Sequence, residues 1–265
     1  MPYAKNGDVN IYYEVEGEGP PLVLGHGGSA EGSFWRRFGY VDALKQDYQL
    51  VLFDTRGHGK SDKPHKVSDY GLNCADDVIT IMDTIGIQKA HYLGFSMGGW
   101  IAYKLALLHY HERFLSFFIA DMSPYESPEE MTKTSRAAAD MMRLLLTDQE
   151  AYLKSVERWF NRSLTPADKE RWLAQDAEAG IAVLESILQG PPLTDQELES
   201  ISVPCLLYCG ELDPFHSGMK ESVNHLPDAK FISVPEIGHG DAWARSDLML
   251  PHIKEFLARV ENKGA

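Results

Sequence analysis

The stretch from His91 to Trp100 (HYLGFSMGGW) constrains the fold most strongly. A strand-like apolar segment enters a turn in which Gly94 and Gly98 flank Ser96, and a helical pattern follows. A serine raised above a sheet needs a tight turn, in which side chains two residues before and after it would collide. The pattern predicts a strand–turn–helix unit with Ser96 at the helix N-terminus, where backbone N–H groups are free. The alternative is a surface serine in a glycine-rich turn.

The composition is that of a globular α/β protein. With 265 residues, the chain fits one large domain or one domain with an insertion. Its net charge of −14 disfavours nucleic acid and anionic membranes as partners. Three cysteines are too few for a disulfide framework, and no apolar run is long enough to span a membrane. These features predict a cytoplasmic protein.

Apolar segments alternate with helical patterns along most of the chain. After a hairpin within residues 3–16, the apolar segments are residues 21–25, 49–54, 90–95, 114–120, 203–210 and 230–234. The main helical patterns between and after them are residues 34–44, 73–85, 100–108, 217–225 and 248–260. Such uniformly apolar strands are typical of a parallel sheet covered by helices on both faces.

The alternation stops between the sixth and seventh expected strands, counted with the two strands of the hairpin. Residues 124–200 contain no convincing strand, and helical patterns cover residues 129–146, 148–160, 166–175 and 177–188. We therefore expect a core of residues 1–123 and 200–265, with a helical lid of residues 124–199 inserted after the sixth strand.

Five segments give the chain a family resemblance. They are His26-Gly27-Gly28, the loop DTRGHGKSD at residues 54–62, GFSMGG at 94–99, GELD at 210–213, and Gly238-His239. In this order the chain resembles the α/β-hydrolase superfamily, in particular its small esterase, enol-lactonase and perhydrolase-like members. The resemblance covers essentially the whole length and implies the α/β-hydrolase fold, with a mostly parallel sheet.

The resemblance implies a nucleophile, an acid and a histidine in that chain order, and Ser96, Asp213 and His239 satisfy it. A serine hydroxyl needs a base to take its proton, and the base needs a partner that stabilises its charge. Two rivals for the acid remain open. Glu211 lies in the same loop as Asp213, and Asp121 follows the strand 114–120.

Histidine is common in this chain, so its position matters more than its presence. His239 lies between two glycines after the last strand, and we expect a flexible loop that lets its ring reach Ser96. His216 follows Asp213 too closely to bridge to Ser96, and His58 is expected to brace loops.

The resemblance also implies an oxyanion hole made of two backbone N–H groups. One belongs to the residue after the nucleophile, Met97, and the other to the loop after His26-Gly27. Gly28 is the expected second donor, and Ser29 is the close alternative. A plain tight turn at Gly27-Gly28 is the structural alternative.

Apolar residues of the expected lid suggest a pocket wall. They are Met141, Met142, Leu144, Leu145, Leu146, Trp159, Phe160 and Trp172, and we add Phe34, Trp35, Phe95 and Trp243 near the site loops. No cluster of ligand-type residues predicts a metal, and no phosphate-binding glycine loop predicts a nucleotide cofactor. Arg36 and Arg37 are the nearest candidates for binding an anion.

The predicted function is that of a cofactor-independent serine hydrolase acting on small, uncharged carboxylic esters. Lactone hydrolysis, perhydrolysis and carbon–carbon bond hydrolysis use the same machinery and remain alternatives. A ligand receptor of the same fold with little turnover is an alternative from a different class.

Overall fold

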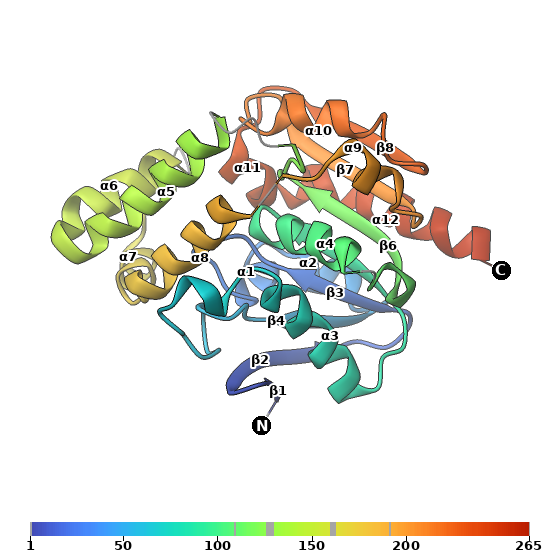
Figure 1. Ribbon diagram of the computed structural model, residues 1–265, viewed down its shortest axis with the longest axis horizontal. Coiled ribbons are helices and arrows are strands. Elements are labelled where there is room, and N and C mark those ends of the chain that lie inside the picture. The colour runs from blue at the N-terminus through green and yellow to red at the C-terminus, as the bar shows by residue number, and fades with distance from the viewer. Residues whose placement is uncertain (1, 109, 126–129, 160–162, 191, 265) are drawn as a thin grey trace.

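The computed structural model describes residues 2–108, 110–125, 130–159, 163–190 and 192–264 (Figure 1). Its centre is one sheet with the strand order β1-β2-β4-β3-β5-β6-β7-β8. The strands are β1 (Tyr3–Asn6), β2 (Val9–Glu16), β3 (Pro21–Gly25), β4 (Gln49–Phe53), β5 (Ala90–Phe95), β6 (Phe114–Ala120), β7 (Cys205–Gly210) and β8 (Ala229–Val234). Pairing is antiparallel from β1 to β2 and from β2 to β4, and parallel from β4 to β8. The predicted, mostly parallel sheet is confirmed.

Helices cover both faces of the sheet, as the uniformly apolar strands predicted. Neighbouring residues of a strand point to opposite faces. Val23 and Tyr92 therefore pack in the cluster with α3 (Asn73–Ile85) and α4 (Met97–Leu107). Leu24 and Leu93 pack in the cluster with α1 (Ser33–Arg37), α2 (Tyr40–Leu44) and α12 (Ser246–Gly264). Among the described residues outside the insertion, the other α-helices are α10 (His216–Ser222) and α11 (His239–Ala244). Where this part is described, it also contains the two 3₁₀ turns η1 (Val67–Asp69) and η2 (Tyr110–Arg113).

The single helix expected over residues 34–44 is wrong, because two short helices, α1 and α2, occupy this stretch. Gly39 between them has a φ of 84°, in the left-handed region. A helix cannot continue through that conformation, which glycine adopts without steric cost.

Between β6 and β7, the described residues form five helices, namely α5 (Glu130–Thr147), α6 (Gln149–Trp159), α7 (Pro166–Leu173), α8 (Ala177–Gln189) and α9 (Asp195–Glu199). We call α5 to α8 the helical block. Figure 1 shows α5, α6 and α7 at one end of the molecule, away from the C-terminus. The block has its own apolar cluster around Met142, Tyr152 and Trp172, whereas Val183 and Ile187 of α8 join the main core. The block therefore packs chiefly through α8 on the rest of the described chain, which contains the sheet and which we call the sheet domain.

Within the described ranges, no helix combines the length and the apolar character that crossing a bilayer requires.

Candidate active site

The turn at Ser96 has the strained geometry that the sequence predicted. Ser96 has a φ of 51° between β5 and α4, unusual for a residue with a side chain. A Cβ at Gly94 would lie 2.4 Å from the carbonyl oxygen of Gly98, and a Cβ at Gly98 would lie 2.1 Å from that of Gly25. Both glycines are therefore required by the close approach of the backbones, and Ser96 stands at the start of α4.

Three predicted side chains form one chain of hydrogen bonds. The Nε2 atom of His239 lies 2.9 Å from Oγ of Ser96, and its Nδ1 atom lies 2.6 Å from Oδ2 of Asp213. The other carboxylate oxygen of Asp213 accepts the backbone N–H of Phe215 at 2.8 Å. The carboxylate thus fixes the tautomer in which Nδ1 carries the proton and Nε2 accepts the hydroxyl proton of Ser96.

His239 is not on a flexible loop, contrary to expectation. It is the first residue of α11, and Gly238 before it is extended, with a φ of −101°. Three aromatic rings surround the imidazole, with centroid distances of 5.2 Å to Phe95, 5.5 Å to Trp159 and 5.6 Å to Phe215. The ring is therefore held by packing, which gives a catalytic base a defined position.

The two rival acids have different surroundings from Asp213. Glu211 accepts a hydrogen bond from Ser233 at 3.4 Å, away from His239. Asp121 is fully buried at the end of β6, and its Oδ1 accepts the N–H of Gly210 at 3.2 Å. Within the described part of the chain, Asp121, Asp213 and His239 have potential metal-ligating atoms within 4.8 Å of one another. Because both ring nitrogens of His239 already have partners, hydrogen bonding accounts for this cluster.

Two buried carboxyl groups this close cannot both be charged without a large energetic cost. Burial and the neighbouring anion of Asp213 raise the pKa of Asp121 well above its ordinary value. Burial also acts to raise the pKa of Asp213, but His239 and the neighbouring carboxyl group of Asp121 outweigh it and lower that pKa. Asp121 therefore carries the proton, and Asp213 is the anion that faces His239.

The geometry of the predicted oxyanion loop distinguishes Gly28 from Ser29. The N–H of Ser29 already donates to Nε2 of His58 at 3.2 Å. Gly28 lines the same cavity as Ser96 and His239, and a Cβ on it would meet no described atom within 4 Å. Met97 is the first residue of α4, so its N–H belongs to the helix end that lacks intrahelical partners. Gly28 and Met97 therefore both suit the role of donors.

Two buried histidines support this loop. Nδ1 of His26 donates to the carbonyl of Gly27 at 2.8 Å, and its Nε2 accepts the N–H of Thr55 at 3.0 Å. Because a trans peptide points its C=O and N–H in opposite directions, this bond also sets the direction of the Gly28 N–H. Burial lowers the pKa of His26 to about 4 and that of His58 to about 3, so both rings are neutral acceptors at neutral pH.

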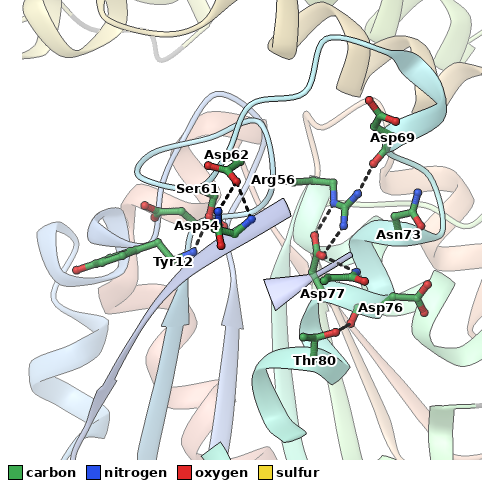
Figure 2. Close-up of polar contacts among 12 residues, drawn as sticks. Tyr12, Asp54, Arg56, Ser61, Asp62, Asp69, Asn73, Asp76, Asp77 and Thr80 are labelled. Atoms are coloured by element: carbon green, nitrogen blue, oxygen red, sulfur yellow. Dashed lines mark hydrogen bonds and ion pairs between the residues drawn. The ribbon is translucent and has the colours of Figure 1, made fainter. Parts of the chain in front are cut away.

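The loop of residues 54–62, which carries His58, is anchored by a buried ion pair (Figure 2). Arg56 donates from Nε and Nη2 to the carboxylate of Asp77 at 2.6 and 2.5 Å. A further donor of Arg56 reaches the carbonyl of Asp69, and Asn6 donates to Asp77 at 2.8 Å. On the other side of the loop, Ser61 and Asp62 bind the strand β2, as Figure 2 also shows. The expectation that His58 braces loops is confirmed.

A cavity of about 100 Å³ contains Ser96 and His239. Its other lining residues are Gly28, Ser29, Ala30, Phe95, Ala138, Met141, Val156, Trp159, Trp172, Leu184, Gly240 and Trp243. None of the described lining residues is Asp, Glu, Lys or Arg. A second cavity of about 190 Å³ shares Ser29 and Ala30 with it and is more polar. The space beside Ser96 is therefore lined mainly by aromatic and aliphatic side chains.

The predicted apolar wall is confirmed only in part. Met141, Trp159, Trp172, Phe95 and Trp243 line the cavity. Met142 and Leu145 instead fill the cluster inside the block, Trp35 lies in the core, Phe34 lines the second cavity and Leu146 is exposed. Phe160 lies outside the described residues. These differences reflect which face of each helix turns toward the cavity.

The two arginines considered for anion binding are paired elsewhere. Arg36 forms ion pairs with Glu14 and Glu16 of β2. Arg37 forms an ion pair with the buried carboxylate of Asp168 at 2.5 Å. Neither lines the cavity around Ser96.

Comparison with known proteins agrees with this geometry, and the chain belongs to the α/β-hydrolase family. The family model described as the alpha/beta hydrolase fold matches residues 20–162. The chain is 31% identical to the pimeloyl-[acyl-carrier protein] methyl ester esterase of Aeromonas hydrophila, over 77% of this chain and 82% of that protein. It is 29% identical to 3-oxoadipate enol-lactonase 1 of Acinetobacter baylyi, over 74% and 72% of the two chains.

A solved structure shows the same fold over nearly the whole chain. The enol-lactonase of Burkholderia xenovorans LB400 superposes with a TM-score of 0.81 and 24% identity, covering 97% of this chain and all of that one (100%).

Proposed function

We propose that this chain is a serine hydrolase that cleaves small, uncharged carboxylic esters through an acyl-enzyme intermediate. The observation that carries the proposal is the continuous hydrogen-bond chain Ser96–His239–Asp213, with distances of 2.9 and 2.6 Å. In its fixed tautomer, His239 can accept the Ser96 proton, and the Asp213 anion stabilises the resulting imidazolium.

The reaction then proceeds in two halves. Oγ of Ser96 attacks the ester carbonyl as its proton passes to Nε2 of His239, and the N–H groups of Gly28 and Met97 stabilise the oxyanion. The intermediate expels the alcohol, which takes the proton from His239, and the acyl group stays on Ser96. Water then gives a proton to His239 and attacks the acyl carbonyl. His239 returns this proton to Oγ of Ser96 as the carboxylic acid leaves, which restores both side chains.

The size and lining of the cavity support a small and uncharged acyl group. A cavity of about 100 Å³ without a described Arg or Lys offers an anionic substrate no counter-charge. The relatives include a methyl ester esterase and an enol-lactonase. Lactone hydrolysis is therefore the second candidate, because a lactone is a cyclic ester that the same groups can open.

Labelling with a fluorophosphonate tests the proposal. Wild type should take up one label, seen by intact mass, and should hydrolyse p-nitrophenyl esters with highest turnover on short acyl chains. Ser96→Ala should take none, and its kcat should fall by about 10⁴-fold or more. Ser200→Ala, on an exposed serine, is the matched control and should behave as wild type. Wild-type protein without labelling or ester turnover would contradict the proposal, and faster opening of simple γ-lactones would favour the second candidate.

A further inference from the structure

All three polar groups of Ser29 are engaged, and two of their partners come from the helical block. The N–H donates to His58, the carbonyl accepts from Nε2 of Gln175 at 2.6 Å, and Oγ lies 3.6 Å from the sulfur of Met142. Gln175 lies between α7 and α8, and Met142 lies on α5. The residue next to the second oxyanion donor is thus held from both sides of the site.

The side chain of Gln175 is itself oriented. The hydroxyl of Tyr152, which is fully buried on α6, donates to Oε1 of Gln175 at 3.0 Å. The amide therefore presents its NH₂ group to the carbonyl of Ser29. The following residue, Asp176, caps α8 by accepting the N–H of Ala179 at 3.0 Å, which fixes the backbone beside Gln175.

The backbone at Ser29 needs such support. Its φ is 59°, in the left-handed region that residues with a side chain rarely adopt. The three successive peptide groups from Gly27 to Ala30 each have an outside partner: His26 on the Gly27 carbonyl, His58 on the Ser29 N–H and Gln175 on the Ser29 carbonyl. Two of these partners belong to the sheet domain, and Gln175 belongs to the helical block.

We propose that Gln175 is a positioning residue that keeps the Gly28 N–H aimed at the oxyanion, so that the oxyanion hole is complete only while the helical block is seated on the sheet domain. This rests on the function proposed above. Gln175 acts through Ser29 and does not line the Ser96 cavity, so its removal should affect transition-state stabilisation more than substrate binding.

Three variants separate positioning from packing. Gln175→Met keeps the side-chain volume and loses the bond to Ser29. Gln175→Glu keeps an acceptor for Tyr152 but sets an oxygen against the Ser29 carbonyl. Tyr152→Phe leaves Gln175 in place and frees its amide to turn. Gln149→Met, on an exposed glutamine at the start of α6, is the matched control.

The measurements are kcat and KM on a p-nitrophenyl ester, affinity for a trifluoromethyl ketone that forms a tetrahedral adduct, and hydrogen exchange of residues 26–31. Removing an oxyanion donor outright costs about 10²–10³ in kcat, so a displaced donor in Gln175→Met should cost roughly 10-fold, with KM nearly unchanged. Affinity for the ketone should fall by the same factor, and hydrogen exchange in residues 26–31 should quicken. The loss of kcat should be largest in Gln175→Glu, smaller in Gln175→Met and smallest in Tyr152→Phe.

The outcomes separate this inference from the proposed function. A Gln175→Met variant with wild-type kcat, ketone affinity and exchange would overturn the inference, as would equal losses in Gln149→Met. If wild type showed no turnover or labelling, the proposed function would fall. Exchange in residues 26–31 would still decide whether Gln175 holds the loop, since that measurement does not depend on catalysis.

Discussion

Two regions of very different construction hold Ser29 from opposite sides. The loop of residues 54–62 supplies His58 and is anchored by the ion pair of Arg56 and Asp77, both nearly inaccessible to water (Figure 2). The helical block supplies Gln175, but α5, α6 and α7 pack mainly on their own cluster. Its ion pairs to the sheet domain, such as Arg37 with Asp168, are partly exposed on at least one side. One support of Ser29 is thus tied to the core by a buried ion pair, whereas the other depends on how the helical block packs against the sheet domain.

The largest effect should come from breaking the anchor of the rigid loop. Asp77→Asn leaves the guanidinium of Arg56 buried without its counter-charge, and such a change costs about 3–5 kcal/mol of unfolding free energy. Urea unfolding of Asp77→Asn and of wild type measures this loss of unfolding free energy. A loss below about 1 kcal/mol would show that the loop does not depend on this pair.

Acidification should also destabilise the part of the protein that supports Ser29 through His58. His26 and His58 are neutral in the folded protein, with pKa values of about 4 and about 3, but take up protons near pH 6.5 once unfolded. Below pH 6.5 the unfolded chain therefore takes up protons at these histidines that the folded protein does not bind. Their contribution to stability is present above pH 6.5 and is lost as the pH falls toward 4. Acidification from pH 7 to pH 5 should therefore lower the unfolding free energy by about 2 kcal/mol for each histidine.

His58→Gln checks this prediction, since glutamine retains an acceptor for the Ser29 N–H but does not titrate. Urea unfolding at pH 7, 6 and 5 should show a loss on acidification about 2 kcal/mol smaller than that of wild type. Equal losses in both proteins would mean that His58 binds its proton equally well in the folded state.

The contrast between these regions was only partly visible in the sequence. The strands were predictable because burial on both faces requires uniformly apolar segments, and Ser96, Asp213 and His239 stand where such strands end. The six-residue helix α11 was missed because it is too short to show a period. The bond from Gln175 to Ser29 joins residues 146 positions apart, and no local pattern reports such a contact. Likewise, the protonation of Asp121 beside the Asp213 anion depends on where the neighbouring strands β6 and β7 end.

The roles of Ser96, Asp213, His239, Gly28 and Met97 stay predictions until the variants are made. The same holds for the division into a core of residues 1–123 and 200–265 and a lid of residues 124–199.

A smaller effect is expected where the block meets α1. Burial alone would raise the pKa of Asp168, but the bonds from Arg37 and Thr165 lower it to about 2. Arg37→Gln should therefore reduce the unfolding free energy by about 1–2 kcal/mol at pH 7. Because this contribution exists above pH 3.8 and disappears as the pH falls through 2, the difference from wild type should vanish in strong acid. Hydrogen exchange should quicken in residues 163–176 and stay unchanged in the 54–62 loop.

The smallest effect should come from an ion pair inside the block itself. Arg143 pairs with Asp140 and Glu185 on the exposed surface of α5 and α8, at 2.8 and 2.9 Å. Water screens such charges, so Arg143→Gln should change the unfolding free energy by less than about 1 kcal/mol and leave ester turnover unchanged. The same arginine-to-glutamine change at Arg37 should cost more, because its partner Asp168 is buried. If the two variants proved equal in urea unfolding and in exchange of residues 163–176, the Arg37–Asp168 pair would not be what seats the block. Gln175 and the α8 contacts would then have to hold it alone.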